Sequence, residues 1–109
     1  GKVAFIGTRG RVTGRSVRAA VGFTAEPDGA ILVAAGDPDA DWALNLISDP
    51  RCTVTIGERR FTALAEQLDG PAHASAVRDL ILRYGTPSEG LGRGPSFRLR
   101  PSAPAPEEP

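Results

Sequence analysis

Apolar and polar residues alternate along the first third of the chain, and this pattern predicts β-strands. The run at 2–8, KVAFIGT, is apolar and rich in strand-forming residues. Between residues 16 and 26 the apolar positions recur at every second residue, which predicts one strand with one face in the core: Val17, Ala19, Val21, Phe23 and Ala25. The turn sequence EPDG at 26–29 then leads into an apolar return strand at 30–35, so the region is predicted to form a hairpin.

Helical spacing appears twice in the rest of the chain. The first helix is predicted at 42–48, WALNLIS, with Asp39 or Asp41 as its N-cap and Pro50 as its stop. The second is predicted at 71–84, followed by Gly85 as the C-cap. Its expected apolar stripe is Ala74, Val77, Leu80, Ile81 and Tyr84.

The remaining strands are predicted at 51–56, from 59 to about 68 after a turn at Gly57-Glu58, and, as a final edge strand, at 96–100. Strands joined mostly by hairpins, with two helices inserted, indicate a small antiparallel barrel of the mainly β or α+β class. A Rossmann domain is disfavoured because no GxGxxG follows a strand and opens a helix. Residues 1–100 are expected to form one domain, and the proline-rich residues 101–109 a disordered tail.

The composition limits the chemistry that side chains alone can perform. The lone Cys52 is expected to be a small buried residue, and the lone His73 is expected to be exposed. One histidine and one cysteine cannot supply a zinc set or a histidine-based triad, so we expect a cofactor to provide any reactive group. With no run of membrane-spanning length and no signal peptide, the expected location is the cytoplasm.

Charge is distributed unevenly, although the chain balances 13 basic against 13 acidic residues. Residues 1–25 carry five basic residues and no acid, whereas residues 26–50 carry six acids and no Lys or Arg. The segment 8–18, TRGRVTGRSVR, interleaves four arginines with glycines and hydroxyl groups, which can bind a phosphate through guanidinium and backbone N–H groups. A solvated turn between two strands is the alternative interpretation.

Three segments in order resemble the deazaflavin-dependent nitroreductase family, whose fold is the FMN-binding split β-barrel. They are TRGRVTGR at 8–15, the stretch at 28–68, and the helix that ends in RYG. The two strongest signals within them are GRVTG at 10–14 and the pattern from Asp41 to Val54 with its tryptophan, asparagine and proline. The similarity runs from about Val3 to Tyr84. Val12 stands where many members have lysine or arginine, and Val17 precedes an arginine that is displaced to position 18.

The resemblance implies a cofactor, the deazaflavin coenzyme F-420, with FMN as the alternative, and hydride transfer to a quinone, nitroaromatic or enone. It also implies which residues bind the cofactor, and none of them is an evident catalytic acid or base. Phosphate binding is expected from Arg11, Thr13 and Gly14, with help from Arg15 and Arg18. The ring is expected at Ala34, Ala35 and Gly36, with Trp42 and Asn45 at the pocket edge.

The residues themselves leave some of these roles open. Trp42 could instead be a core anchor, and Asn45 an exposed helix residue. A second hypothesis is a non-catalytic barrel that binds flavin, haem or lipid. A single-stranded nucleic-acid binder is a third, which the shortage of aromatic residues for base stacking disfavours. A homodimer is expected by analogy with other split barrels.

Overall fold

The computed structural model describes residues 3–84 and 91–102 as seven strands and two helices. The strands are β1 (Ala4–Arg9), β2 (Ser16–Val21), β3 (Thr24–Ala25), β4 (Ile31–Ala34), β5 (Arg51–Ile56), β6 (Arg59–Leu68) and β7 (Ser96–Pro101), and the helices are α1 (Asp41–Ser48) and α2 (Gly70–Tyr84). The expected cap at Gly85 and residues 103–109 of the expected tail lie outside the described residues.

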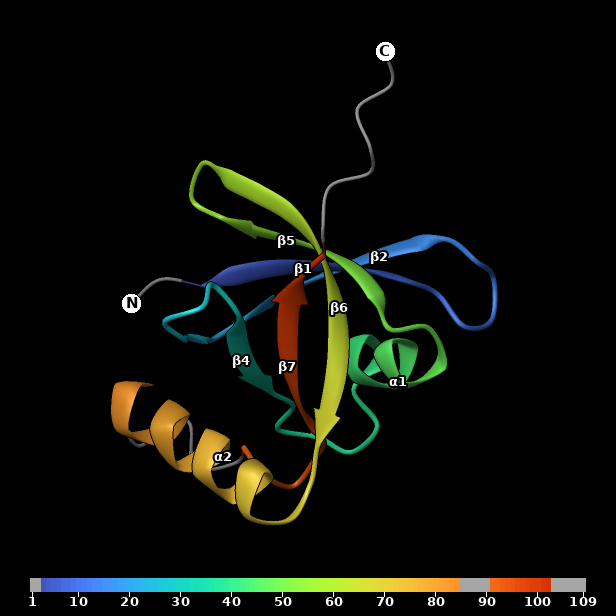
Figure 1. Ribbon diagram of the computed structural model, residues 1–109. Coiled ribbons are helices and arrows are strands. Elements are labelled where there is room, and N and C mark those ends of the chain that lie inside the picture. Colours follow the sequence, from blue (N-terminus) through green and yellow to red (C-terminus); the bar gives the residue numbers. More distant parts are fainter. Residues whose placement is uncertain (1–2, 85–90, 103–109) are drawn as a thin grey trace.

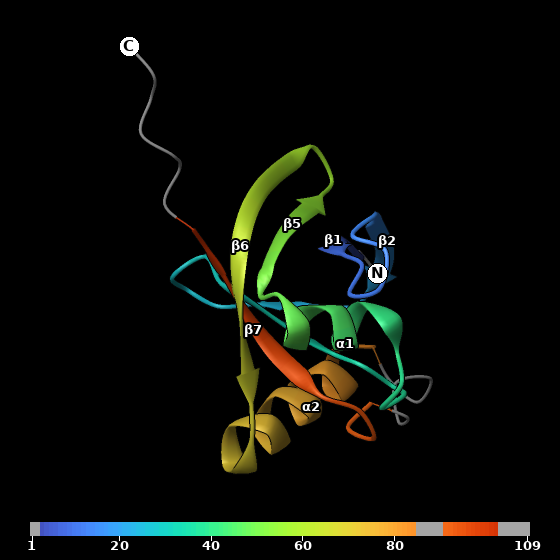
Figure 2. The same cartoon turned by 90° about the vertical axis from the view of Figure 1, so that its right-hand side faces the viewer.

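All seven strands form one antiparallel sheet in the order β2-β1-β5-β6-β7-β4-β3. In Figure 1, β1 and β2 run across the direction of β6 and β7, so the sheet curls into a half barrel. Helix α1 packs against β1 and β2, and α2 packs against β4 and β7, as Figure 2 also shows. This architecture confirms the predicted antiparallel split barrel with two helices.

The single strand predicted over 16–26 is wrong, because the chain breaks at Gly22 and Phe23 into β2 and β3. The two pieces lie at opposite edges of the sheet. The Tyr84 ring lies so close to Gly22 that an added Cβ would be 3.0 Å from it. The Tyr84 hydroxyl accepts a hydrogen bond from Phe23 N (2.9 Å) and donates one to Phe23 O (3.1 Å), which replaces the ladder bonds at the break.

The final strand is also misplaced by the prediction. Instead of forming an edge, β7 pairs with both β6 and β4 near the middle of the sheet. Its residues Ser96, Phe97 and Leu99 are buried, and Phe97 packs against Trp42 with ring centroids 5.9 Å apart. The core therefore depends on a strand from the end of the chain.

Both helices differ in detail from the prediction. The N-cap of α1 is Ala40, which makes no side-chain capping bond, so neither Asp39 nor Asp41 caps this helix. In α2 the buried residues are Ala76 and Leu80, whereas Ala74 is exposed. The expected exposure of His73 is wrong, because its Nδ1 lies 2.6 Å from Oγ of the buried Ser96.

Cys52 is buried as predicted, and burial raises the pKa of its thiol to about 11. Within the described residues, neither helix has the length and apolar character needed to cross a membrane.

Candidate functional site

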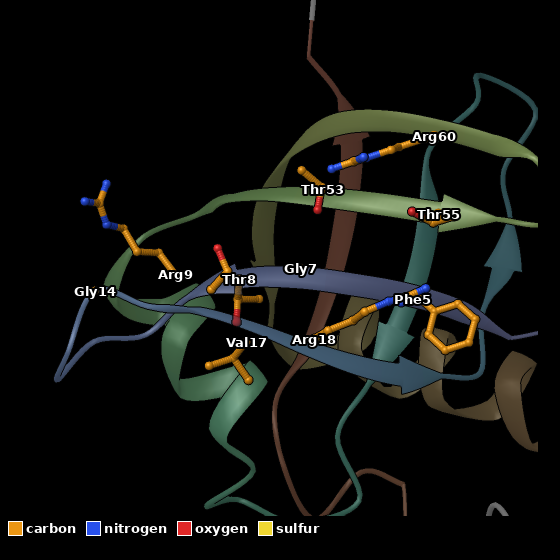
Figure 3. A pocket seen from close by; sticks show the side chains of 11 residues that line it. Phe5, Gly7, Thr8, Arg9, Gly14, Val17, Arg18, Thr53, Thr55 and Arg60 are labelled. Carbon is orange, nitrogen blue, oxygen red and sulfur yellow. The ribbon is translucent and has the colours of Figure 1, made fainter.

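A groove of about 760 Å³ lies over the solvent-facing side of β1, β2 and β5, with one wall from β6 (Figure 3). Side chains alternate along β1, so that Ala4, Ile6 and Thr8 are buried while Phe5, Gly7 and Arg9 lie on the other face. The groove is lined by Phe5, Gly7, Thr8, Arg9, Gly14, Ser16, Val17, Arg18, Thr53, Thr55 and Arg60.

Strand register and one glycine create the hollow. Gly7 is paired with Arg18 on one side and with Thr53 on the other, so a position without a side chain lies between two polar ones. A Cβ added at Gly7 would clash with Oγ1 of Thr53. The same register pairs Thr55 with both Phe5 and Arg60, which brings β6 to the groove.

The groove is basic, because Arg9, Arg18 and Arg60 line it and no carboxylate of the described residues does. Within residues 3–84 and 91–102, none of these three guanidinium groups forms an ion pair. Elsewhere on the sheet, by contrast, Arg98 and Arg100 are paired with acidic residues. Figure 3 shows the Arg60 side chain directed toward Thr53 and the Arg18 side chain directed toward Phe5, whereas the Arg9 guanidinium points away from both. Cations that line a hollow without a counter-charge attract an anionic ligand.

An acidic side chain that interacts electrostatically with Arg9, Asp49, lies in a neighbouring hollow that Arg9 also lines. Asp49 is bound by Arg51, whose Nη2 lies 2.9 Å from its Oδ2. Hydrogen bonds from the Arg51 side chain and backbone lower the pKa of Asp49 to about 2, and Arg9 adds a smaller effect. Asp49 is thus already satisfied by another cation.

The arginine loop, residues 10–15, uses most of its own backbone donors. Gly10 N donates to Arg15 O (2.7 Å), Gly14 N to Gly10 O (2.9 Å), Arg15 N to Thr13 Oγ1 (3.3 Å) and Arg11 N to Asn45 Oδ1 (3.2 Å). Four of the loop's N–H groups are therefore bonded within the protein, and phosphate binding by this loop stays a prediction.

The backbone geometry of the loop requires glycine at both of its glycine positions. A Cβ on Gly10 would lie 2.9 Å from Arg15 O, and Gly14 has a φ of 76°, which disfavours other residues. The GRVTG element thus specifies a tight loop.

Arg11 turns toward α1 instead of toward the groove. Its Nη1 donates to Asn45 Oδ1 (2.8 Å), and its Nη2 lies 3.2 Å from Asp41 Oδ1. Asn45 is 2% exposed, so the alternative of an exposed helix residue is wrong. Its Nδ2 donates to Oγ1 of Thr8, which is also buried (3.1 Å).

The structure separates the sequence-predicted site residues into three places. Gly14 and Arg18 line the groove, while Arg11, Thr13 and Asn45 line a separate hollow of about 170 Å³ with Asp41. Arg15 is exposed and lines neither.

The expected ring-binding segment lies away from both hollows. Ala34 and Ala35 are buried, and the Ala35 backbone is bonded to Pro95 O and Gly94 N, so it is covered by the chain itself. Gly36, which follows, is exposed. Trp42 is half-buried against Phe97, which is the geometry of a core anchor.

Sequence reasoning missed Phe5, Thr53, Thr55 and Arg60 as groove residues, whereas Arg9 belongs to the segment that it proposed for phosphate binding. The Gly57-Glu58 turn does fix the pairing of Thr55 with Arg60, so that part could have been found. The pairing of β1 with β5 brings these residues close to Arg18. No pattern of neighbouring residues in the sequence predicts this pairing.

Comparisons with known proteins agree with this fold. No match was found among curated proteins. The heme storage protein HutZ from Vibrio cholerae has a TM-score of 0.75 and 18% identity, over 93% of this chain and 82% of that one. The protein Atu2129 from Agrobacterium tumefaciens has a TM-score of 0.74 and 25% identity, over 93% of this chain but only 48% of that one. An F420-H2 dependent reductase has a TM-score of 0.72 and 18% identity, over 90% and 93% of the two chains.

The family comparison covers most of the chain. The model of the F420H(2)-dependent quinone reductase family matches residues 1–86, and this confirms the resemblance that the GRVTG element and the Asp41 to Val54 pattern suggested. The chain belongs to the F420H(2)-dependent quinone reductase family.

Proposed function

We propose that this protein transfers a hydride from reduced coenzyme F-420 to a small acceptor, a quinone in the first place and a nitroaromatic or enone as the alternative acceptors. The family's name supports both the coenzyme and the quinone. We place the coenzyme in the groove because Arg9, Arg18 and Arg60 line it and no carboxylate of the described residues does.

The residues of the groove fit the coenzyme in charge and size. F-420 carries a phosphate and an oligoglutamate tail, so most of its charged groups are anionic. Arg9, Arg18 and Arg60 would hold these groups, and the hydroxyls of Thr53 and Thr55 offer further hydrogen bonds. A volume of about 760 Å³ is within the range of small-molecule sites.

The coenzyme supplies the hydride chemistry when it is bound. The chain contributes position and electrostatics, since no Asp, Glu, His, Cys or Tyr in the part of the chain that the structure describes lines the groove. Reduction of a quinone to a hydroquinone takes one hydride and one proton. With no general acid among the described residues of the lining, we expect that proton to come from water.

The fold similarity to HutZ favours a second candidate, a binding protein without turnover. Haem, however, takes an axial ligand from His, Cys, Met or Tyr, and the groove lining contains none of these. In this groove, the ligand for the second function would therefore be a flavin such as FMN or a lipid, whereas His73, a residue that could ligate haem, lines a different hollow.

The test is a fluorescence titration of the purified protein with F-420 and with FMN, followed by oxidation of the reduced coenzyme by menadione. We expect binding of F-420 below the high micromolar range and oxidation of the coenzyme that depends on both protein and menadione. Binding without turnover would support the second candidate. No binding of either cofactor would overturn the proposed site.

A cytoplasmic location and a homodimer also remain predictions. One of the matched structures, with a TM-score of 0.74 and 20% identity, is named as a domain-swapped dimer. Light scattering of the purified protein measures the oligomeric state directly.

A further inference from the structure

Asn45 joins three parts of the protein that are distant in sequence. Its side chain lies between α1, which carries it, the end of β1 at Thr8, and the arginine loop at Arg11. Its Oδ1 accepts from both the backbone N (3.2 Å) and the Nη1 (2.8 Å) of Arg11, and its Nδ2 donates to Thr8 Oγ1 (3.1 Å). We refer to Thr8, Arg11, Asp41 and Asn45 together as the loop clamp.

The loop clamp is built from a buried amide and is not a chance surface contact. Asn45 is 2% exposed and Thr8 is 3% exposed, so water cannot readily replace these bonds. Arg11 adds a second attachment, because its guanidinium also reaches the Asp41 backbone O (3.4 Å) and side chain (3.2 Å). Together these bonds fix one end of the loop to the first turns of α1.

The other side of the same loop borders the groove. Arg9 and Gly14 line it, and the Arg9 Nε lies 4.0 Å from where a Gly14 Cβ would be. The loop also closes on itself between Gly10 and Arg15. A change in how Arg11 is held is therefore transmitted to Gly14 and Arg9 through a short closed loop.

We propose that Asn45 is a positioning residue that sets the phosphate selectivity of the groove by holding the arginine loop on α1. It does not contact the phosphate in this arrangement. Arg11, expected from the sequence to bind phosphate, acts through the same clamp. The phosphate part of this inference rests on the proposed function, whereas the effect on the loop does not.

Substitutions of similar size at Asn45 or at Thr8 remove hydrogen bonds of the loop clamp. Asn45→Leu removes all three hydrogen bonds of the amide, and Thr8→Val removes the acceptor of Asn45 Nδ2. Thr8→Ser keeps that acceptor and is the matched conservative control. Ile47→Ala changes a half-exposed residue of the same helix outside the clamp and controls for damage to α1.

The first readout is amide hydrogen exchange by NMR without any ligand. In Asn45→Leu and Thr8→Val we expect the Gly10, Arg11 and Gly14 amides to exchange at least about tenfold faster, with Val54 unchanged. Thr8→Ser and Ile47→Ala should match the wild type. Unchanged loop exchange in both clamp variants would overturn the proposal, and Thr8→Val decides the matter where Asn45→Leu does not fold.

The second readout is the ratio of dissociation constants for dephosphorylated F-420 and intact F-420. We expect Asn45→Leu, which changes a residue outside the groove lining, to lose at least about tenfold of the wild-type preference for the phosphorylated form, while its affinity for the dephosphorylated form changes little. An equal loss for both ligands would overturn the selectivity role. If the wild type binds neither form, the proposed function fails, and the exchange experiment still decides the clamp.

Discussion

Arg18 projects from β2 beside Gly7, and its guanidinium carbon lies 4.2 Å from the centroid of the Phe5 ring. It lines the groove and forms no ion pair with any carboxylate of the described residues. Arg18→Gln removes the positive charge but keeps a polar side chain of moderate length. It therefore tests whether the groove binds an anion.

The expected loss follows from the surroundings of Arg18. A hydrogen bond to a charged group contributes about 1.5–3 kcal/mol, and Arg18 is exposed, so the lower end applies. About 1.5 kcal/mol corresponds to roughly tenfold weaker binding of F-420. The lost contact with the half-exposed Phe5 ring lowers the free energy of unfolding by no more than about 1 kcal/mol.

The assay is a fluorescence titration with F-420, paired with denaturant unfolding of the same sample. Arg98→Gln is the matched control, because Arg98 forms an ion pair with Glu26 (2.7 Å) and lines none of the groove. We expect Arg98→Gln to lower the free energy of unfolding by about 1–2 kcal/mol and to leave coenzyme affinity unchanged.

Arg18→Gln should thus lose affinity for the coenzyme with little loss of stability, whereas Arg98→Gln should lose stability with unchanged affinity. The loss caused by Arg18→Gln should also shrink as salt concentration rises, since salt screens exposed charges. If Arg18→Gln binds F-420 within twofold of the wild type at low salt, the groove is not the site of the coenzyme's anionic groups.

Four further predictions concern side chains whose surroundings are set by the fold. Tyr84→Phe should lower the free energy of unfolding by about 2 kcal/mol in guanidinium titrations, because the Phe23 backbone N–H and C=O lose their partner; an unchanged midpoint would contradict this. Gly14→Ala should cost about 1 kcal/mol of stability, because Gly14 has a φ of 76°, and equal stability of both proteins would count against the loop geometry. Iodoacetamide should label Cys52 slowly at pH 8, since burial raises its pKa to about 11 from an ordinary 9.0. The raised pKa means that stability falls between pH 9 and 11, and Cys52→Ala should remove that part of the fall in pH-dependent denaturation curves.

Most secondary structure could be predicted because its signals are local. The strands at 51–56 and 59–68 carry period-two patterning and a glycine turn, and both have the predicted bounds. The Pro71 start signal and apolar spacing located α2 to within one residue. The arginine-rich segment at 8–18 was correctly identified as unusual, since charge and glycine content are properties of the sequence itself.

The errors arose where distant residues compete with a local pattern. Gly22 continues the period-two alternation, yet the Tyr84 ring occupies the space beside it and its hydroxyl binds Phe23. Nothing near residue 22 in sequence signals a tyrosine 62 positions later. In the same way, a strand at the end of the chain can be placed at an edge or in the middle only by knowing its partners.

The sequence by itself determined the mainly β class, most of the elements, and a basic segment near the N-terminus suited to an anion. Only the tertiary structure decided which basic groups are available. It pairs Arg11 with Asp41 and Asn45 on α1, and it assembles Arg18 and Arg60 around Gly7 through strand pairing. The physical reason is that a guanidinium group's role depends on whether a carboxylate lies within reach, and such distances are set by the packing of segments far apart in the chain.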